Sequence, residues 1–131
     1  MDNLINEFVE LKVEKELNAF SVKFLKYVKL QDFKKIVEHE FELIEQYKLK
    51  KAIIDLRLLP VYDTGMPEYI KEVWFPKVIE LGLKYVAFVQ PEKILGQMTM
   101  KKAHKEEEVK IPITMEHFGD FDEALNWLKS C

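Results

Sequence analysis

The fold is decided by the short stretch KKAIIDL, residues 50–56. It is apolar and β-branched at its centre and charged at its start, a pattern that predicts a strand buried in the core. The run KYVAFV, residues 84–89, has the same character. Because the segment between the two runs is long enough for a helical crossover, we expect the two strands to lie parallel and side by side in an α/β domain.

Upstream of this pair, apolar and polar residues alternate. The alternation predicts strands over residues 8–16 and 19–28, joined by a turn near Leu17 and Asn18. The first strand is polar enough to be an edge strand, and the two would form an antiparallel hairpin. Apolar residues then recur at spacings of three and four, which predicts an amphipathic helix over residues 31–48.

Downstream, a second helical stripe covers residues 69–81, and Pro76 within it predicts a kink. Residues 92–104 are expected to form a third helix. Residues 108–118 alternate again and predict an edge strand. A final helix is expected to start at Asp120, which has a glutamate three residues later in the manner of a capping box. The predicted order is therefore ββαβαβαβα.

This order predicts one α/β domain over residues 1–131: an open, mostly parallel sheet with an antiparallel hairpin at its start and four helices. In such sheets, functional sites lie beyond the carboxyl ends of the central strands. The stretch DLRLLPVYDTGMPEYI, residues 55–70, leaves a central strand at this edge. It is the best candidate for a working part of the molecule.

The centre of this stretch has two possible roles. Asp63 and Thr64 are predicted to cap the helix that follows, with Gly65 relaxing the backbone. Alternatively, Thr64 is a phosphate acceptor, since the amide groups and dipole of a helix N-terminus favour an anion.

Apolar side chains on the same loop indicate a binding cavity. Because loops are normally polar, we expect residues 60–67 to form a mobile flap over an apolar space. Neighbouring residues on a helix diverge by ~100°, so Trp74 and Phe75 are expected not to share a buried face. One of them should be exposed, at an interface or lining a pocket beside the kink. The side chains expected to bind the ligand are Tyr62, Met66, Trp74, Phe75, Met98 and Met100.

Composition argues against several classes of function. A net charge of −3 argues against a nucleic-acid partner. His39, His104 and His117 lack the spacing of metal ligands, and each is expected at the surface or its boundary. The glycines are spread singly, so no phosphate-binding loop and no cofactor is expected. The lone Cys131, with no secretory signal and no apolar run of ~20 residues, leads us to expect a cytoplasmic protein.

Several motifs resemble a known family. Asp55-Leu56, followed by Asp63-Thr64-Gly65-Met66, resembles the Asp-Leu and Asp-Ser-Ser-Gly-Leu segments of STAS domains, the anti-sigma factor antagonists. One hydroxyl residue is missing here, and Thr64 stands where that family has its phosphorylated serine. EVWFPKVIELGLKYVAFVQPE at 72–92, GQM at 96–98 and DEALNWL at 122–128 are similar to the SpoIIAA-like branch of the superfamily.

The resemblance implies an STAS-like α/β domain, often dimeric, that is related to CRAL-TRIO lipid-carrying domains. We therefore expect a non-enzymatic binding or regulatory module, and a homodimer, that holds an apolar, lipid-like ligand or associates with a membrane surface. The alternative is a phospho-regulated protein–protein interaction switch at Thr64. A third possibility is an enzyme that uses Asp55 or Asp63 as a base.

Overall fold

The computed structural model describes residues 3–104 and 111–131. Their strands form one six-stranded sheet in which spatial order follows chain order. The strands are β1 (Leu4–Ile5), β2 (Val9–Glu14), β3 (Ala19–Phe24), β4 (Lys51–Asp55), β5 (Tyr85–Val89) and β6 (Thr114–Phe118). Strand β2 is antiparallel to both of its neighbours, β1 and β3, and the later pairs are parallel.

The two apolar runs that decide the fold lie side by side as expected. Ile53 pairs with Ala87 and Ile54 with Phe88, in parallel register. Ile54 is buried against the helices on one face of the sheet, whereas Ile53 is buried against the last helix on the other face. This burial on both faces explains why β4 is a continuous apolar run.

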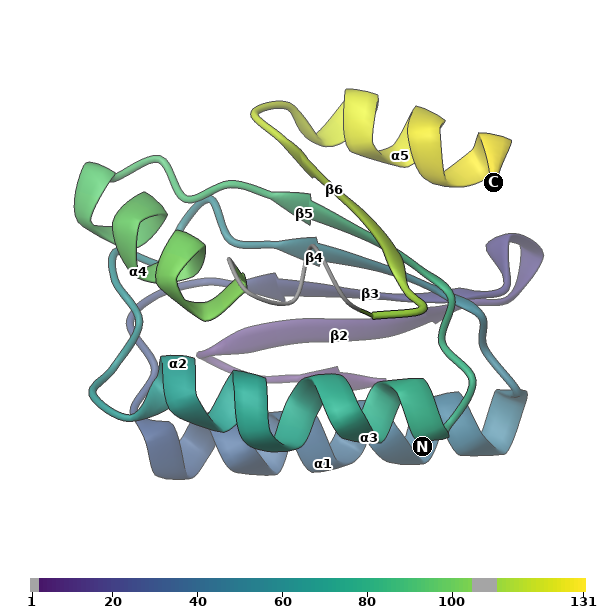
Figure 1. Cartoon of the computed structure of the whole chain (residues 1–131), viewed down its shortest axis with the longest axis horizontal. Coiled ribbons are helices and arrows are strands. Elements are labelled where there is room, and N and C mark those ends of the chain that lie inside the picture. The colour runs from purple at the N-terminus through teal and green to yellow at the C-terminus, as the bar shows by residue number, and fades with distance from the viewer. Residues whose placement is uncertain (1–2, 105–110) are drawn as a thin grey trace.

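Four helical segments cover the sheet, as the pattern predicts. One of them, between β4 and β5, is continuous but changes its winding along its length. Figure 1 shows this helix and α1 on one face of the sheet and α5 on the other. The elements are α1 (Leu30–Tyr47), α2 (Met66–Tyr69), the π-helical turn η2 (Ile70–Trp74), α3 (Phe75–Glu80), α4 (Ile94–His104), α5 (Phe121–Ser130) and the short 3₁₀ turn η1 (Lys15–Leu17).

The expected edge strand, β2, is not the edge of the sheet. The Asn6 side chain accepts hydrogen bonds from the backbone N–H groups of Phe8 (2.8 Å) and Val9 (3.1 Å), which turns the chain back on itself. Leu4 then pairs with Leu11, so the short β1 covers β2. At the other side of the sheet β6 is the last strand, as predicted, although residues 108–110 of the predicted strand lie outside the described residues.

A π-helical turn precedes Pro76 at the place where we expect a kink. The Phe75 N–H bonds the carbonyl oxygen of Ile70, five residues earlier, and Pro76 is the second residue of α3. Such a turn changes the winding of a helix locally and is one of the recognised ways to accommodate a proline.

Neither Trp74 nor Phe75 is exposed, since both are buried. Of the alternatives expected for them, the structure supports the pocket, because Trp74 lines an internal cavity. Their rings meet edge to face at 4.9 Å. Trp74 reaches Glu40 on α1, whereas Phe75 packs against His104 on α4, with ring centroids 5.9 Å apart. The helix is covered by α1 on one side and α4 on the other, so neighbouring residues that diverge by ~100° both find buried surroundings. These two aromatics therefore offer no surface for a dimer.

Candidate functional site

An apolar cavity lies at the carboxyl ends of the central strands, beneath the segment that connects β4 to α2. The cavity has a volume of about 30 Å³, which is enough for one or two water molecules. Side chains from the sheet, from α1, from the helix after β4 and from α4 close it. They are Phe24, Phe33, Glu40, Ile54, Leu56, Tyr62, Met66, Ile70, Trp74, Phe88 and His104. We call residues 56–66, which supply three of these side chains, the roof segment.

The structure brings together three of the six expected ligand-binding residues, since Tyr62, Met66 and Trp74 all line the cavity. Phe75 and Met100 are buried next to it without lining it. Met98 is 63% exposed, because it lies two positions before the buried Met100 and so ~200° away around α4.

Glu40 is the lining residue that the sequence analysis missed. It is 2% exposed, and its Oε1 accepts a hydrogen bond of 2.9 Å from Trp74 Nε1. Burial raises the pKa of this carboxyl to about 8, and the Trp74 hydrogen bond opposes the rise only in part. The side chain is therefore mostly uncharged at neutral pH. The sequence did hold a signal, because Glu40 falls three residues after Val37 and four before Ile44, inside the apolar stripe of α1.

His104 corrects a second expectation, because it is buried and not at the surface or its boundary. His39 and His117 are partly exposed, as expected. The Nδ1 atom of His104 lies 3.0 Å from Nε2 of His117. Phe88 packs against both rings, with centroid distances of 4.3 Å and 5.0 Å. Burial, and next the neighbouring His117, lower the pKa of His104 to about 3, so its ring is neutral in the folded protein. The pair ties the end of α4 to β6.

Asp63 caps a helix, but not the one that follows it. Its carboxylate accepts a hydrogen bond from the backbone N–H of Leu30 (2.7 Å), the first residue of α1, and another from the Tyr27 hydroxyl. The Tyr27 bond, and next the Leu30 bond, hold the pKa of Asp63 below its usual value. Thr64 is exposed, and the N-cap of α2 is Gly65 at φ +85°, with no side-chain bond. The predicted caps on α2 are therefore wrong.

The roof segment has two further attachments. The backbone N–H of Tyr62 donates to Thr99 Oγ1 on α4 at 3.1 Å. At the first turn of α4, a side-chain carbon added to Gly96 would lie 2.8 Å from the carbonyl oxygen of Pro60, so only glycine allows this close approach. The roof is thus held between the start of α1 and the start of α4.

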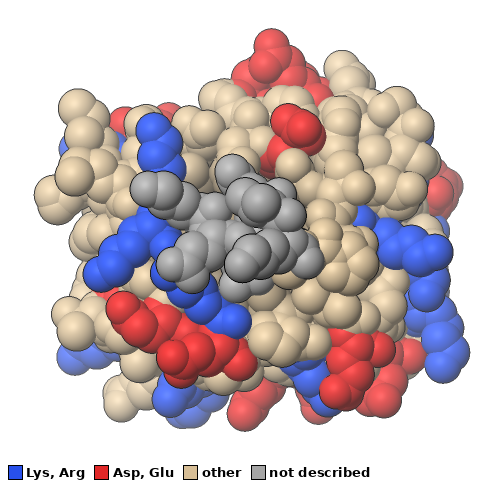
Figure 2. Space-filling view, in the orientation of Figure 1, with Lys and Arg blue, Asp and Glu red and all other residues tan. Residues whose placement is uncertain are grey.

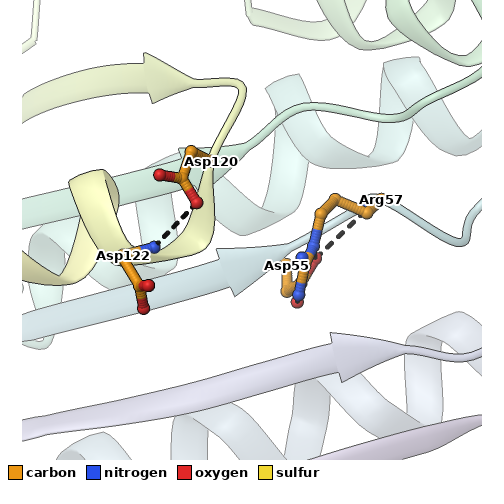
Figure 3. Close-up of polar contacts among 4 residues, drawn as sticks. All are labelled: Asp55, Arg57, Asp120 and Asp122. Atoms are coloured by element: carbon orange, nitrogen blue, oxygen red, sulfur yellow. Dashed lines mark hydrogen bonds and ion pairs between the residues drawn. The ribbon is translucent and has the colours of Figure 1, made fainter.

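Asp55, at the end of β4, forms an ion pair with Arg57. Figure 3 shows the Arg57 side chain folded back onto it. Arg57 Nε and Nη2 donate to the two carboxylate oxygens at 3.0 Å and 2.8 Å, and the Arg57 backbone N–H donates at 3.1 Å. The same view shows Asp120 at the start of α5, where it accepts a hydrogen bond from the N–H of Asp122. Both carboxylates hold the chain in place here, which leaves the buried Asp55 poorly suited to act as a base.

A wider groove on the α5 side of the sheet is a weaker candidate. It is shallow and open, with a volume of about 950 Å³. Lysine and glutamate side chains alternate along it, including Glu14, Lys15, Lys51 and Lys129. Ligand sites are usually enclosed and mostly apolar with a few polar groups, which describes the cavity under the roof and not this groove.

Two classes of site find no support in the described part of the chain. Residues 3–104 and 111–131 contain no cluster of three side chains suited to hold a metal ion. None of the helices in these ranges combines the length and apolar character needed to cross a membrane.

Comparison with known proteins identifies the architecture. No protein-family model and no curated protein matches the chain. The structure is similar to the crystal structure of an uncharacterised protein of the DUF3478 family from Shewanella loihica PV-4, which has a SpoIIAA-like fold. The TM-score is 0.53 at 18% sequence identity, over 95% of this chain and 98% of the other.

The chain has a SpoIIAA-like fold. This confirms the fold that the resemblance at residues 55–66 and 72–92 implies. The mixed six-stranded sheet, with an antiparallel start and four helices, is consistent with it. At 18% sequence identity, the similarity shows the fold alone.

The cap on α1 leads to the first prediction. Replacing Asp63 with alanine should lower the urea midpoint of unfolding at pH 7, because the Leu30 N–H loses its acceptor. Thr64→Ala is the matched control, and it should leave the midpoint nearly unchanged because Thr64 is exposed. The pKa of Asp63 is lowered in the folded state, so its contribution should vanish as the pH falls below the unfolded value near 3.8. A larger loss from Thr64→Ala than from Asp63→Ala would contradict this assignment.

The buried carboxyl leads to the second prediction. The pKa of Glu40 is raised from 4.5 to about 8 on folding, so its stabilising effect is complete below pH 4.5 and is lost as the pH rises through 8. At about 1.4 kcal/mol per pH unit, this amounts to on the order of 5 kcal/mol. Glu40→Gln keeps an acceptor for Trp74 Nε1 and should avoid that loss.

The test of this second prediction is urea unfolding from pH 5 to pH 8. The stability of Glu40→Gln relative to the wild type should increase steadily across this range. Glu45→Gln, at an exposed position on the same helix, is the control and should run parallel to the wild type. Equal pH slopes for Glu40→Gln and the wild type would show that Glu40 is ionised in the folded protein.

Proposed function

We propose that this protein is a non-enzymatic binding module that takes up an apolar, lipid-like molecule beneath the roof segment. The observation that supports the proposal is the cavity itself. Its walls are aromatic and aliphatic, and it lies at the sheet edge where open α/β domains place their ligands. Its polar members, Glu40, Tyr62 and His104, are too few to solvate a polar ligand and are suited to orient an apolar one.

Uptake requires the roof segment to move outward. Ligand pockets typically measure 300–1,000 Å³, whereas the volume of this cavity is about 30 Å³. The side-chain and backbone hydrogen bonds of Asp63 and Tyr62 hold the roof to α1 and α4. Burial of an apolar chain contributes roughly 25 cal/mol per Å², which can offset the loss of a few such bonds.

The third prediction uses the position of the two tryptophans. Trp74 lines the cavity, whereas Trp127 lies on α5, on the opposite face of the sheet. In a Trp127→Phe variant, binding of the uncharged fluorophore N-phenyl-1-naphthylamine should quench Trp74 emission and increase probe fluorescence in parallel. A saturable response with both changes would support the proposal, and no change in either signal would refute it.

A cavity-filling variant provides the control for that titration. Ile70→Phe places extra volume inside the cavity and should weaken probe binding by about ten-fold or more. Val73→Phe adds a bulkier aromatic on the same π-helical turn at a position that is partly exposed, and should leave binding unchanged. Circular dichroism of both variants would establish that they are folded. Equal weakening by both would place the probe outside the cavity.

A second candidate function, association with a membrane surface, is favoured by the first turns of α4. Ile94 is 75% exposed, Leu95 57% and Met98 63%, and their spacing of one and four residues gives them a shared side of the helix. Lys93, Lys101 and Lys102 are exposed on the same segment. Figure 2 shows basic side chains next to uncharged surface on the left of the molecule, where α4 lies. Apolar side chains flanked by lysines suit an anionic lipid surface.

The fourth prediction tests this surface by co-sedimentation with lipid vesicles. The protein should bind vesicles of phosphatidylcholine and phosphatidylglycerol more strongly than phosphatidylcholine alone. Leu95→Glu combined with Met98→Glu should abolish that binding. Ile5→Glu is the matched control, because Ile5 is equally exposed but belongs to β1. Vesicle binding that survives the α4 substitutions would exclude this helix as the contact.

Two further expectations remain proposals with less support. A phosphate on Thr64 would stand beside the Asp63 carboxylate, which already occupies the first free amide of α1. The alternative, a phospho-regulated switch, therefore rests on the exposure of Thr64 alone. A homodimer would use the sheet edges or the exposed side of α4, because Trp74 and Phe75 are buried.

A further inference from the structure

Three polar side chains of the cavity have atoms without a partner among the described residues. The first is Glu40, whose Oε1 bonds Trp74 and whose Oε2 bonds nothing. The second is the Tyr62 hydroxyl. The third is Nε2 of His104, whose Nδ1 faces His117. In the described ranges, every buried side-chain nitrogen or oxygen that is inaccessible to solvent has a hydrogen-bond partner. Because these three atoms have none, each must be accessible to a water molecule. For Glu40, the accessible space is the cavity that it lines.

The groups around Glu40 make this space uncharged but able to donate hydrogen bonds. Glu40 is protonated at neutral pH, and because Oε1 accepts from Trp74, its proton is available on Oε2. The titratable groups that face it are Tyr62 in the roof segment, His104 on α4 and Tyr69 on α2. Burial raises the pKa of both tyrosines and lowers that of His104, so all three are neutral. Among the residues that the structure describes, no lysine or arginine lines the cavity.

We propose that the cavity selects uncharged apolar molecules that carry one oxygen acceptor, such as an alcohol, ketone or ester, and that the Glu40 carboxyl donates the hydrogen bond that selects them. This proposal rests on the proposed function and specifies its ligand class. A pure hydrocarbon would displace water from Glu40 without replacing its hydrogen bond, which is unfavourable for a buried donor. A carboxylate would bury a charge, and the described lining residues include no cation to pair it.

The pH dependence follows from the same group. As the pH rises past 8, Glu40 ionises and changes from a donor into a charged acceptor. Binding of an acceptor ligand should therefore weaken on the alkaline side. Glutamine at this position keeps N–H donors at all pH values, whereas leucine keeps none.

The experiment is competition against N-phenyl-1-naphthylamine with 1-decanol, 2-decanone, decanoate and the hydrocarbon decane. At pH 7 the alcohol and the ketone should bind at least about ten-fold more tightly than decanoate, the ratio expected for one hydrogen bond or one uncompensated charge. Wild-type affinity for 2-decanone, whose oxygen can only accept, should fall between pH 7 and pH 9, and that of Glu40→Gln should not. Glu40→Leu should lose the preference for decanol over decane while still binding the fluorophore.

The outcomes separate the two proposals. If the fluorophore does not bind, the cavity holds water alone and both proposals fail. If the fluorophore binds but decanoate competes as well as decanol, apolar uptake stands and the selection by Glu40 is wrong. A decanol preference that persists in Glu40→Leu, or an alkaline loss that persists in Glu40→Gln, would also overturn it. Since Glu40→Gln keeps the acceptor for Trp74, it gives an answer even if Glu40→Leu does not fold.

Discussion

The hydrogen bond between Trp74 and Glu40 joins the two helices that cover the main face of the sheet. It lies in the apolar layer between α1 and the helix that follows the roof segment, where both partners are almost fully buried. A carboxyl group placed there must be neutral, hydrogen-bonded or both, because an unpaired charge in the core is strongly unfavourable. The protonation state of Glu40 therefore depends on the position of Trp74, and the π-helical turn sets that position.

The roof segment is positioned by contacts that connect distant parts of the chain. Asp63 caps α1, which begins 33 residues earlier in the sequence, and Tyr62 is held by Thr99 on α4. A loop fixed at both sides by hydrogen bonds, with its apolar side chains packed beneath it, closes the cavity without the need for a rigid secondary structure. Its stability depends on only a few bonds, and such segments open at lower free energy than the core around them.

The cavity and the exposed side of α4 are adjacent in the structure. The first turn of α4 packs on the backbone of the roof segment at Gly96, and its last residue, His104, forms part of the cavity wall. A displacement of α4 would therefore affect both the roof and the wall. The exposed apolar residues Ile94, Leu95 and Met98 lie on this same helix, which gives a physical link between contact with an apolar surface and access to the cavity.

The sequence by itself determined the sheet and its helices. β-branched runs, alternation and spacings of three and four depend on neighbouring residues, so they predicted β4, β5 and α1 to within about one residue at each end. The strand predicted over residues 19–28 is real but ends at Phe24. The sequence also predicted that Tyr62 and Met66 of the roof segment cover an apolar space, because they are apolar residues on a loop. It predicted in addition that Trp74 lines that space. The edge strand β1 could not be predicted, because a strand of two residues is too short to show an alternation of apolar and polar side chains.

The tertiary structure decided what lies inside the cavity and what the caps do. Glu40, His104 and Trp74 come from three helices, and the partner of Asp63 belongs to a helix that precedes it in the chain. The protonation of Glu40 depends on burial, which no local pattern specifies. Exposure of Met98 and burial of Phe75 depend on which sides of their helices are covered by other elements. These properties arise from packing between distant segments, and only the folded chain defines them.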